Sequence, residues 1–401
     1  MLVLEAKLQG KKEQYEKLDE AIRTARFVRN SCVRYWMNNR DIGRYELSAY
    51  CAVLANEFEW ANKLNSMARQ ASAERAWSAI SRFYDNCKKK APGKKGYPKF
   101  KKEQTHGSVE YKTTGWKLSA DRRYITFSDG FEAGAFKMWG TRDLHFYQIK
   151  QFKRVRVVRR ESSGYYVQFC VDQERLEKRE PTLKTVGIDV GLNHFYTDSD
   201  GHTVAHPSHL RKSEKSLKRL QRRLSKTKKG SKNRAKFRSK LARKHLKVSR
   251  QRKDFAIKTA RCVVSNSDLV AYEDLKVRNM VRNRHLAKSI SDAAWTQFRS
   301  WVEYFAKVFG VVTVAVPPHY TSQNCSNCGK VVKKTLSTRT HTCLHCGHVQ
   351  DRDHNAARNI LEKALRTAGH VGTHASGETD QYLGEETPPS KSTRGKRKPG
   401  K

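Results

Sequence analysis

Four cysteines in the last quarter of the chain have the spacing of metal ligands. Cys325 and Cys328 form one CxxC pair, and Cys343 and Cys346 form a second pair after 14 intervening residues. Each pair turns tightly enough for two thiolates to bind one ion, and four thiolates complete the tetrahedral shell of a structural zinc site. A catalytic zinc would need an open position, so we expect one structural Zn²⁺ here that fixes shape.

An apolar stretch in the middle of the chain ends in a carboxylate. KTVGIDVG, residues 184–191, reads as a buried strand ending at Asp189, with Gly187 and Gly191 on either side. A carboxylate at a strand end, with little side-chain bulk beside it, can hold a metal ion close to a phosphate. An aspartate in this position is also an ordinary turn residue or helix cap, so the stretch alone leaves both interpretations open.

Two later acids lie at the ends of other predicted elements. Glu273 ends a predicted strand, 268–274, and Asp353 lies on the apolar face of a predicted helix that starts near Asp351. We interpret Asp351 as the N-cap of that helix and Asp353 as the functional acid. Together with Asp189, these carboxylates could bring two Mg²⁺ ions to about 3.5–4 Å apart, one activating water and the other stabilising the leaving oxygen.

The charge of the chain predicts a large polyanionic partner. The 401 residues include 82 Lys and Arg against 39 Asp and Glu, a formal net charge of +43. Self-repulsion on this scale favours nucleic-acid binding, because phosphates would compensate it. No apolar run approaches the roughly 20 residues that span a bilayer, so we expect no membrane partner. The other five cysteines are isolated in sequence, which fits a reducing cytosol.

The first half of the chain must supply a sheet and a helical insertion. Residues 2–8 alternate as a strand, and the apolar spacing then becomes helical over 11–40, 47–60 and 66–87. Short alternating segments follow up to residue 172, which predicts an antiparallel barrel or sandwich whose first strand is separated from its partners. Within them, residues 153–157 alternate cations with valines, and this face is either a solvated edge strand or a nucleic-acid surface.

The second half must position the acids. After a predicted linker, 174–181, the strand ending at Asp189 leads into a hairpin that turns at Asp200–Gly201. The most basic segment, 211–253, predicts an antiparallel helical hairpin whose cations contact phosphate; among them are Arg222, Arg223, Lys228 and Lys229.

A strand over 268–274, a helix over 290–309, a strand over 311–316 and a helix over 351–366 complete the second half, and the polar remainder from 367 is expected to be disordered. Strand, hairpin, helix, strand, helix, strand and helix, with acids at these points, is the layout of an RNase H-like nuclease.

At this point the sequence resembles the TnpB family of transposon-encoded RNA-guided DNA endonucleases, relatives of the type V CRISPR effectors. The resemblance is carried by GIDVG (187–191), YEDL (272–275), YTSQNCSNCG (320–329), CLHCG (343–347) and DRDHNAARNI (351–360), with ARFVRN (25–30) and GYPKFKK (96–102) nearer the start.

The resemblance implies an α+β multidomain fold. It consists of a split wedge-type, OB-like β-barrel (1–10 and 91–180), a helical recognition insertion (11–90), a RuvC-like nuclease domain (181–320 and 349–366, with the basic hairpin) and a zinc-ribbon target-loading element (321–348). Residues 367–401 would be a disordered basic tail.

The resemblance also implies roles for single residues. Asp189, Glu273 and Asp353 would be the catalytic Mg²⁺ ligands and the four cysteines the Zn²⁺ ligands. Tyr45 and Gln70 fall near positions that read the target-adjacent motif. The expected activity is that of a Mg²⁺-dependent endodeoxyribonuclease in a prokaryotic cytosol, whose partners are a guide RNA and target double-stranded DNA. Two alternatives stay open: a guide-dependent DNA-binding repressor that does not cleave, and an RNase H-like transposase that joins DNA ends.

Overall fold

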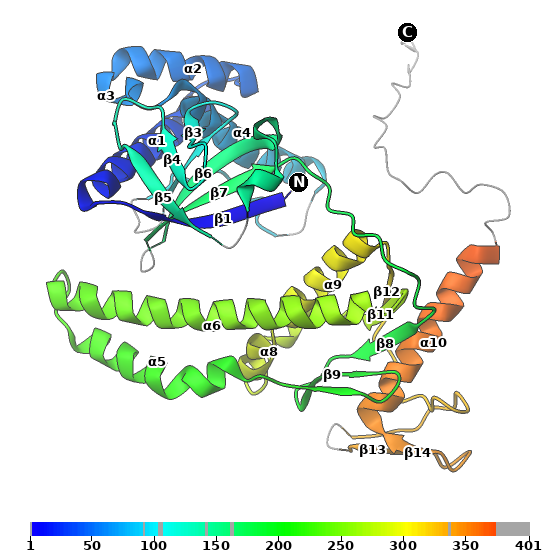
Figure 1. Ribbon diagram of the computed structural model, residues 1–401. Coiled ribbons are helices and arrows are strands. Elements are labelled where there is room, and N and C mark those ends of the chain that lie inside the picture. Colours follow the sequence, from blue (N-terminus) through cyan, green and yellow to red (C-terminus); the bar gives the residue numbers. More distant parts are fainter. Residues whose placement is uncertain are drawn as a thin grey trace, which may run out of the picture. The chain divides into compact units, whose positions relative to one another are not determined.

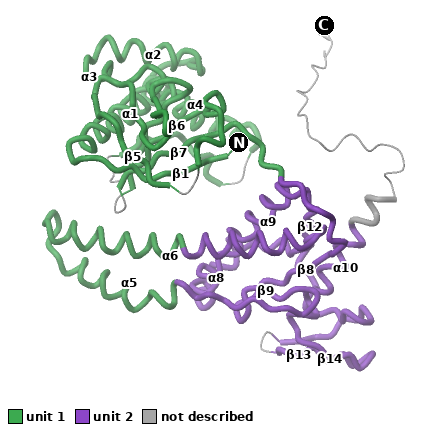
Figure 2. Tube along the Cα trace, in the orientation of Figure 1, with its two compact units in different colours: residues 1–176, 210–250 green, residues 177–209, 251–401 purple. Residues whose placement is uncertain are grey.

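The computed structural model describes residues 2–90, 93–102, 107–140, 143–160, 164–335 and 338–373. The chain divides into two compact units, residues 1–176 with 210–250 and residues 177–209 with 251–401 (Figure 2). Helix α10 (Arg352–Thr373) continues past the predicted end at 366, so the first residues of the expected disordered tail are helical. The rest of that tail, 374–401, lies outside the described residues.

The first unit contains a seven-stranded antiparallel sheet in the order β2-β6-β7-β1-β5-β4-β3 (Figure 1). Its strands are β1 (Leu2–Gln9), β2 (Gly107–Tyr111), β3 (Trp116–Leu118), β4 (Tyr124–Phe127), β5 (Ala135–Trp139), β6 (Phe152–Arg160) and β7 (Gly164–Val171). Strand β1 lies between β7 and β5, far from both in sequence, as predicted. The outer strands β2 and β3 form no ladder with one another among the described residues, so the sheet is a half-barrel and not a closed barrel.

Helices inserted between β1 and β2 complete the first unit. They are α1 (Lys12–Asn38), α2 (Arg44–Glu57), α3 (Glu59–Asn62) and α4 (Ser66–Lys88), and short 3₁₀ turns follow later at Leu144–Phe146 and Ile149–Gln151. Helix α1 serves two cores because its apolar stripe is long. Leu18 and Ile22 pack into the core of the sheet, whereas Cys32 and Trp36 pack against α2 and α4.

The alternating cations of β6 are engaged within the protein. Arg154 and Arg156 contact Glu110, which is 2% exposed, at 2.7 Å and 2.5 Å. Strand β6 is also an interior strand, paired with β2 and β7. Strand β6 is therefore not the edge strand that was one interpretation of the sequence. Glu110 holds both arginines, whose side chains stay about 40% exposed, so the other interpretation, a nucleic-acid surface, stays a prediction.

The basic segment forms two helices, α5 (His209–Lys226) and α6 (Lys232–Ser265), joined by the predicted turn. Helix α6 is longer than predicted, since it continues past the predicted end of the hairpin at 253 to Ser265. It begins in the first unit and ends in the second.

The second unit is built on a five-stranded sheet in the order β10-β9-β8-β11-β12. Its strands are β8 (Thr185–Asp189), β9 (His194–Asp198), β10 (Thr203–Ala205), β11 (Leu269–Glu273) and β12 (Val312–Val316). Strands β8, β9 and β10 are antiparallel neighbours, whereas β11 is parallel to both β8 and β12. The hairpin turns where predicted, at Gly201, whose φ is +89°.

Each face of this sheet packs on a different helix, because side chains alternate along a strand. Ala271 and Val316 face α10, whereas Ile188 and Val270 share a core with α9 (Trp295–Phe309) and the end of α6. The predicted helix 290–309 is two helices: α8 (Ala287–Ala293) ends before Ala294, whose left-handed φ of 56° breaks the run.

The short helix α7 (Val277–Met280) and the two-stranded pair β13 (Thr340–Thr342) and β14 (Val349–Asp351) complete this unit. Among the helices of the described residues, none has the length and apolar composition of a membrane span.

Candidate metal centres

The parallel register of β8 and β11 brings two of the predicted acids to adjacent positions. Ile188 pairs with Tyr272, so Asp189 and Glu273 follow side by side at the carboxyl ends of neighbouring strands. By alternation both side chains leave the face that carries Ile188 and point to the α10 side. Neighbouring strands lie about 4.8 Å apart, which puts two carboxylates within reach of the same ions.

Helix α10 brings the third acid to the same edge of the sheet. Asp353 lies in its first turn, is 8% exposed, and has one carboxylate oxygen 3.7 Å from the position that a Cβ on Gly191 would occupy. Asp351 caps this helix as predicted, since its side chain accepts hydrogen bonds from the backbone N–H groups of Asp353 (2.8 Å) and His354 (3.1 Å). The three predicted acids therefore converge.

The electrostatics of this cluster fit a divalent cation. Burial, followed by the charges of Glu273 and Asp353, raises the pKa of Asp189 well above its ordinary value, and Arg352 opposes the shift. Burial likewise raises the pKa of Glu273, against the hydrogen bond from Thr321 and the charge of Lys363. Carboxylates that repel one another in a partly desolvated site release protons when a cation binds between them.

Hydrogen bonds from neighbouring side chains orient two of the acids. The Thr321 hydroxyl donates to Glu273 Oε1 at 2.5 Å. Arg352 donates through Nε and a terminal nitrogen to Asp353 Oδ1, each at 3.2 Å, and Arg339 lies 3.9 Å from Oδ2.

The two glycines on either side of Asp189 have different surroundings. A Cβ on Gly187 would lie 2.3 Å from the carbonyl oxygen of Ala357 and 2.8 Å from the backbone nitrogen of Leu361, so α10 fills the space that a side chain would need. The expectation that both glycines leave room beside a metal-bound phosphate is therefore wrong for Gly187. Gly191 alone borders the acids.

The four cysteines form a second, separate centre. Their sulfur atoms all lie within 4.8 Å of one another, with Cys325–Cys346 at 3.7 Å and Cys328–Cys343 at 3.6 Å. A tetrahedral ion with metal–sulfur bonds of about 2.3 Å would separate its sulfurs by about 3.8 Å, which these distances fit.

Both CxxC turns have the same backbone geometry. Gly329 and Gly347 take φ of +74° and +70°, and each donates its N–H to the carbonyl of the first cysteine of its pair. The arrangement can hold one metal ion and leaves it no free position.

Two asparagines that were not predicted connect the cysteine segment to α10. Asn355 is fully buried, accepts the Ser326 N–H at 2.9 Å and donates to Asn324 O at 2.8 Å. Asn359, one turn later, donates to the carbonyls of Thr321 and Asn324, both at 2.8 Å. Their spacing of four residues beside the apolar stripe of the helix was the available sequence signal.

The residues proposed to contact nucleic acid lie mostly at the surface. Tyr45 on α2 is 84% exposed. Gln70 on α4 is half-buried and accepts a hydrogen bond from Lys112 at 3.3 Å. The remaining four are exposed, on α5 and in the turn after it: Arg222, Arg223, Lys228 and Lys229.

Two family models match the chain in the segments that carry these centres. The model OrfB_IS605, described as a probable transposase, matches residues 168–284 and includes Asp189 and Glu273. The model described as a Cas12f1-like TNB domain matches residues 295–360 and includes the four cysteines and Asp353. A relative named "TnpB-like protein L770", from Acanthamoeba polyphaga mimivirus, is 25% identical over 272 residues, 63% of this chain and 51% of that one.

The chain is similar to the TnpB-like proteins. A "Putative RNA-guided DNA endonuclease" from Streptomyces pristinaespiralis is 39% identical to this TnpB-like chain over 210 residues, 52% of each. The chain thus spans about half the length of this curated relative. The "Putative RNA-guided DNA endonuclease InsQ" from Escherichia coli K12 is 28% identical over 333 residues, 79% of this chain and 78% of that one.

A solved structure shares the fold of this TnpB-like chain. The protein in the cryo-EM structure of a Cas12f1–sgRNA–target DNA complex superposes with a TM-score of 0.55 at 15% identity, covering 88% of this chain and 83% of that one. The α+β fold with a half-barrel sheet is therefore common to both.

Proposed function

We propose that this chain is an RNA-guided, Mg²⁺-dependent DNA endonuclease of a transposable element. The observation that carries the proposal is the convergence of Asp189, Glu273 and Asp353 at one edge of the second sheet. The strand order supports it, because three antiparallel strands followed by two parallel ones is the order of an RNase H-like, RuvC-type nuclease. In this assignment the half-barrel is the wedge part and α1–α4 the recognition insertion.

The three acids would hold two Mg²⁺ ions. When bound, the ions activate a water and stabilise the leaving oxygen of the phosphodiester. The protein's own contribution is orientation: Thr321 fixes Glu273, Arg352 fixes one oxygen of Asp353, and the Asp351 cap fixes the first turn of α10. Partial burial keeps the carboxylates poorly hydrated, which raises their affinity for cations.

The four cysteines would hold one structural Zn²⁺. The sulfur distances and the two glycine turns support zinc, and the closed shell assigns it a structural role. Asn355 and Asn359 tie the cysteine segment to the helix that carries Asp353. We assign this segment, 321–348, as the element that loads target nucleic acid beside the acids.

Guide RNA and target DNA are the proposed partners. The net charge of +43 and the exposed cations of α5 support polyanion binding. The matched relatives are named as RNA-guided DNA endonucleases, and the superposed structure is titled as a complex with sgRNA and target DNA. In such effectors base pairing supplies most of the sequence specificity and protein cations hold the backbones.

The test uses purified full-length protein with its co-purifying RNA. That RNA is sequenced, a DNA matched to its variable end is prepared, and cleavage is measured with Mg²⁺ for the wild type and for Asp189→Ala. We expect cleavage by the wild type and at least a 100-fold loss in the variant, with RNA binding retained. Asp200→Ala, an exposed acid in the neighbouring turn, is the matched control and should cleave normally.

Each other outcome excludes the proposal in a defined way. Cleavage by Asp189→Ala would contradict the metal-site assignment. Tight binding of matched DNA by the wild type without any cut would indicate a guide-dependent repressor. Joined DNA products in the absence of RNA would indicate a transposase.

A further inference from the structure

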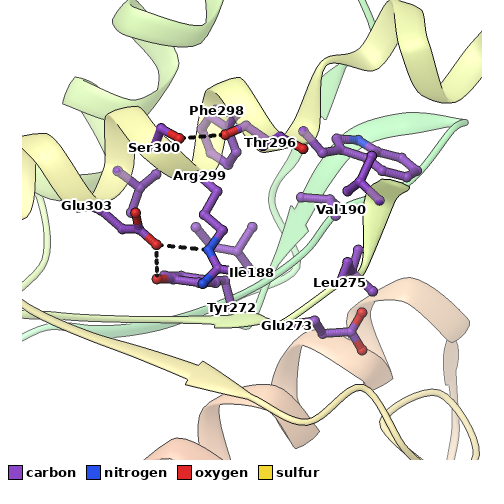
Figure 3. Close-up of a pocket in the computed structure, with 13 residues that line it drawn as sticks. Ile188, Val190, Tyr272, Glu273, Leu275, Thr296, Phe298, Arg299, Ser300 and Glu303 are labelled. Carbon is purple, nitrogen blue, oxygen red and sulfur yellow. Dashed lines mark hydrogen bonds and ion pairs between the residues drawn. The ribbon is translucent and has the colours of Figure 1, made fainter. Parts of the chain in front are cut away.

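A cavity of about 250 Å³ lies within the second unit, and Glu273 of the acid cluster is one of its lining residues (Figure 3). Ile188 and Leu275, at the carboxyl ends of β8 and β11, line one side, and Trp295 and Phe298 of α9 line the other. The cavity is therefore on the α9 face of the strand edge whose α10 face carries the acids. Glu273, the last residue of β11, borders both.

The polar wall of the cavity is fixed by its own contacts. Glu303 Oε1 accepts hydrogen bonds from Arg299 Nε at 2.8 Å and from the Tyr272 hydroxyl at 2.9 Å (Figure 3). The Arg299 guanidinium lies 5.1 Å from the centre of the Tyr272 ring and also pairs with Asp274. These contacts hold the Tyr272 and Arg299 side chains in place at the cavity wall.

The opposite wall is aromatic. Trp295 and Phe298 of α9 form it, and both are buried. Aromatic rings on this wall, with the Tyr272 ring on the polar wall, favour a flat ring as the occupant of the cavity.

We propose that this cavity receives one base of the DNA strand being cut, turned out of its stack next to the phosphate held by the acids. The inference rests on the proposed nuclease function, and it adds a base-sized subsite to it. Drug-sized ligand pockets measure roughly 300–1,000 Å³, so about 250 Å³ suits a single ring system and not a whole nucleotide.

All four bases satisfy this chemistry, because each has an aromatic face. A base stacked in a duplex cannot enter such a pocket, so the subsite acts on single strands or on an unpaired nucleotide. The subsite would position the scissile phosphate by holding its neighbour, independently of the guide.

Photo-crosslinking tests occupancy without requiring cleavage. The RNA-loaded Asp189→Ala protein is bound to single-stranded DNA that has 5-iododeoxyuridine at successive positions, irradiated, digested and mapped by mass spectrometry. We expect one position, or two adjacent ones, to crosslink to Tyr272 or Trp295. Val277→Phe, which fills the cavity from its lining, should abolish this crosslink, whereas Val281→Phe, which adds the same ring outside the lining, should retain it. Crosslinks that avoid both residues, or that survive Val277→Phe, would overturn the proposal.

A kinetic cycle tests the consequence for cleavage. Single abasic nucleotides are placed along the cut strand, and the rate is measured with wild type and with Val277→Phe. An abasic site at the crosslinking position should slow the wild type roughly 5- to 150-fold, the range of one base–aromatic stack, and should slow Val277→Phe hardly further. Equal effects in both proteins at every position would overturn the subsite. If crosslinking succeeds but wild-type protein never cuts, the nuclease proposal fails and the subsite stands.

Discussion

Replacing Gly187 by alanine should disturb the acid centre through the helix that packs on it. The added Cβ would lie 2.3 Å from the carbonyl oxygen of Ala357, and real Cβ atoms essentially never approach closer than 3.0 Å. Backbone atoms form both sides of this contact, so β8 and α10 must separate by at least about 0.7 Å. Asp353 lies one turn before Ala357 on the same helix and must move with it.

The magnitude has two parts. Overpacking a well-packed core costs about 1–3 kcal/mol. For a domain of this size each kcal/mol lowers the melting temperature by about 2–4 °C. A misplacement of close to 1 Å at a catalytic group costs about 100-fold in rate. Gly187→Ala should therefore melt several degrees lower and cleave about 100-fold more slowly, even at temperatures where it is fully folded.

Differential scanning fluorimetry and single-turnover cleavage with saturating Mg²⁺ would measure both effects. Gly191→Ala is the matched control for stability, because its Cβ would meet His194 O at 3.1 Å, a tight contact but a far longer one than the 2.3 Å at Gly187. It should lose less than about 1 kcal/mol of stability. If Gly187→Ala melts and cleaves like the wild type, then α10 does not hold Asp353 by its packing on β8, and the reasoning is refuted.

Three further results are expected. Folding raises the pKa of Asp189 above its ordinary 3.8, so the folded state binds the proton more tightly, and metal-free stability falls as pH rises above about 4. Asp189→Asn should therefore raise the free energy of unfolding of the metal-free protein at pH 8 but not at pH 4, by about 1.4 kcal/mol for each tenfold change in proton affinity, and its melting temperature should rise accordingly. Mg²⁺ should stabilise only the wild type. Cys328→Ser should lower the zinc content measured by atomic absorption and slow cleavage, whereas serine at the isolated, exposed Cys87 should change neither. Changing Arg222, Arg223, Lys228 and Lys229 to glutamine should reduce the slope of log K against log salt for RNA binding by about 3 if all four contact phosphate, and an unchanged slope would exclude these contacts.

Much of this architecture could be predicted because local pattern encodes it. Alternation along β6 and β7 set their faces, and the apolar face of α10 separated Asp353 from the capping Asp351. A parallel sheet brings carboxyl ends together, which made the meeting of Asp189 with Glu273 predictable from two strand ends.

The remainder depends on partners far away in sequence. Nothing in the sequence near Arg154 indicates that its guanidinium would form an ion pair with Glu110, 44 residues earlier. The space beside Gly187 is filled by a helix about 170 residues later, so a packing glycine and a substrate-facing glycine look alike in the sequence. Asn355 and Asn359 find their acceptors in a loop whose path no periodic pattern describes.

The capping of α10 has a consequence for the order in which this protein matures. Asp351 ends β14, which pairs with β13 in the cysteine-rich segment, so the residue that caps the helix belongs to the part that zinc would organise. Until that segment folds, the first turn of α10 lacks its cap and Asp353 its fixed position. A newly made chain would then pass through a stage that can bind RNA but cannot cut. The chain would therefore become able to cut only after it binds zinc, and not as soon as it is synthesised.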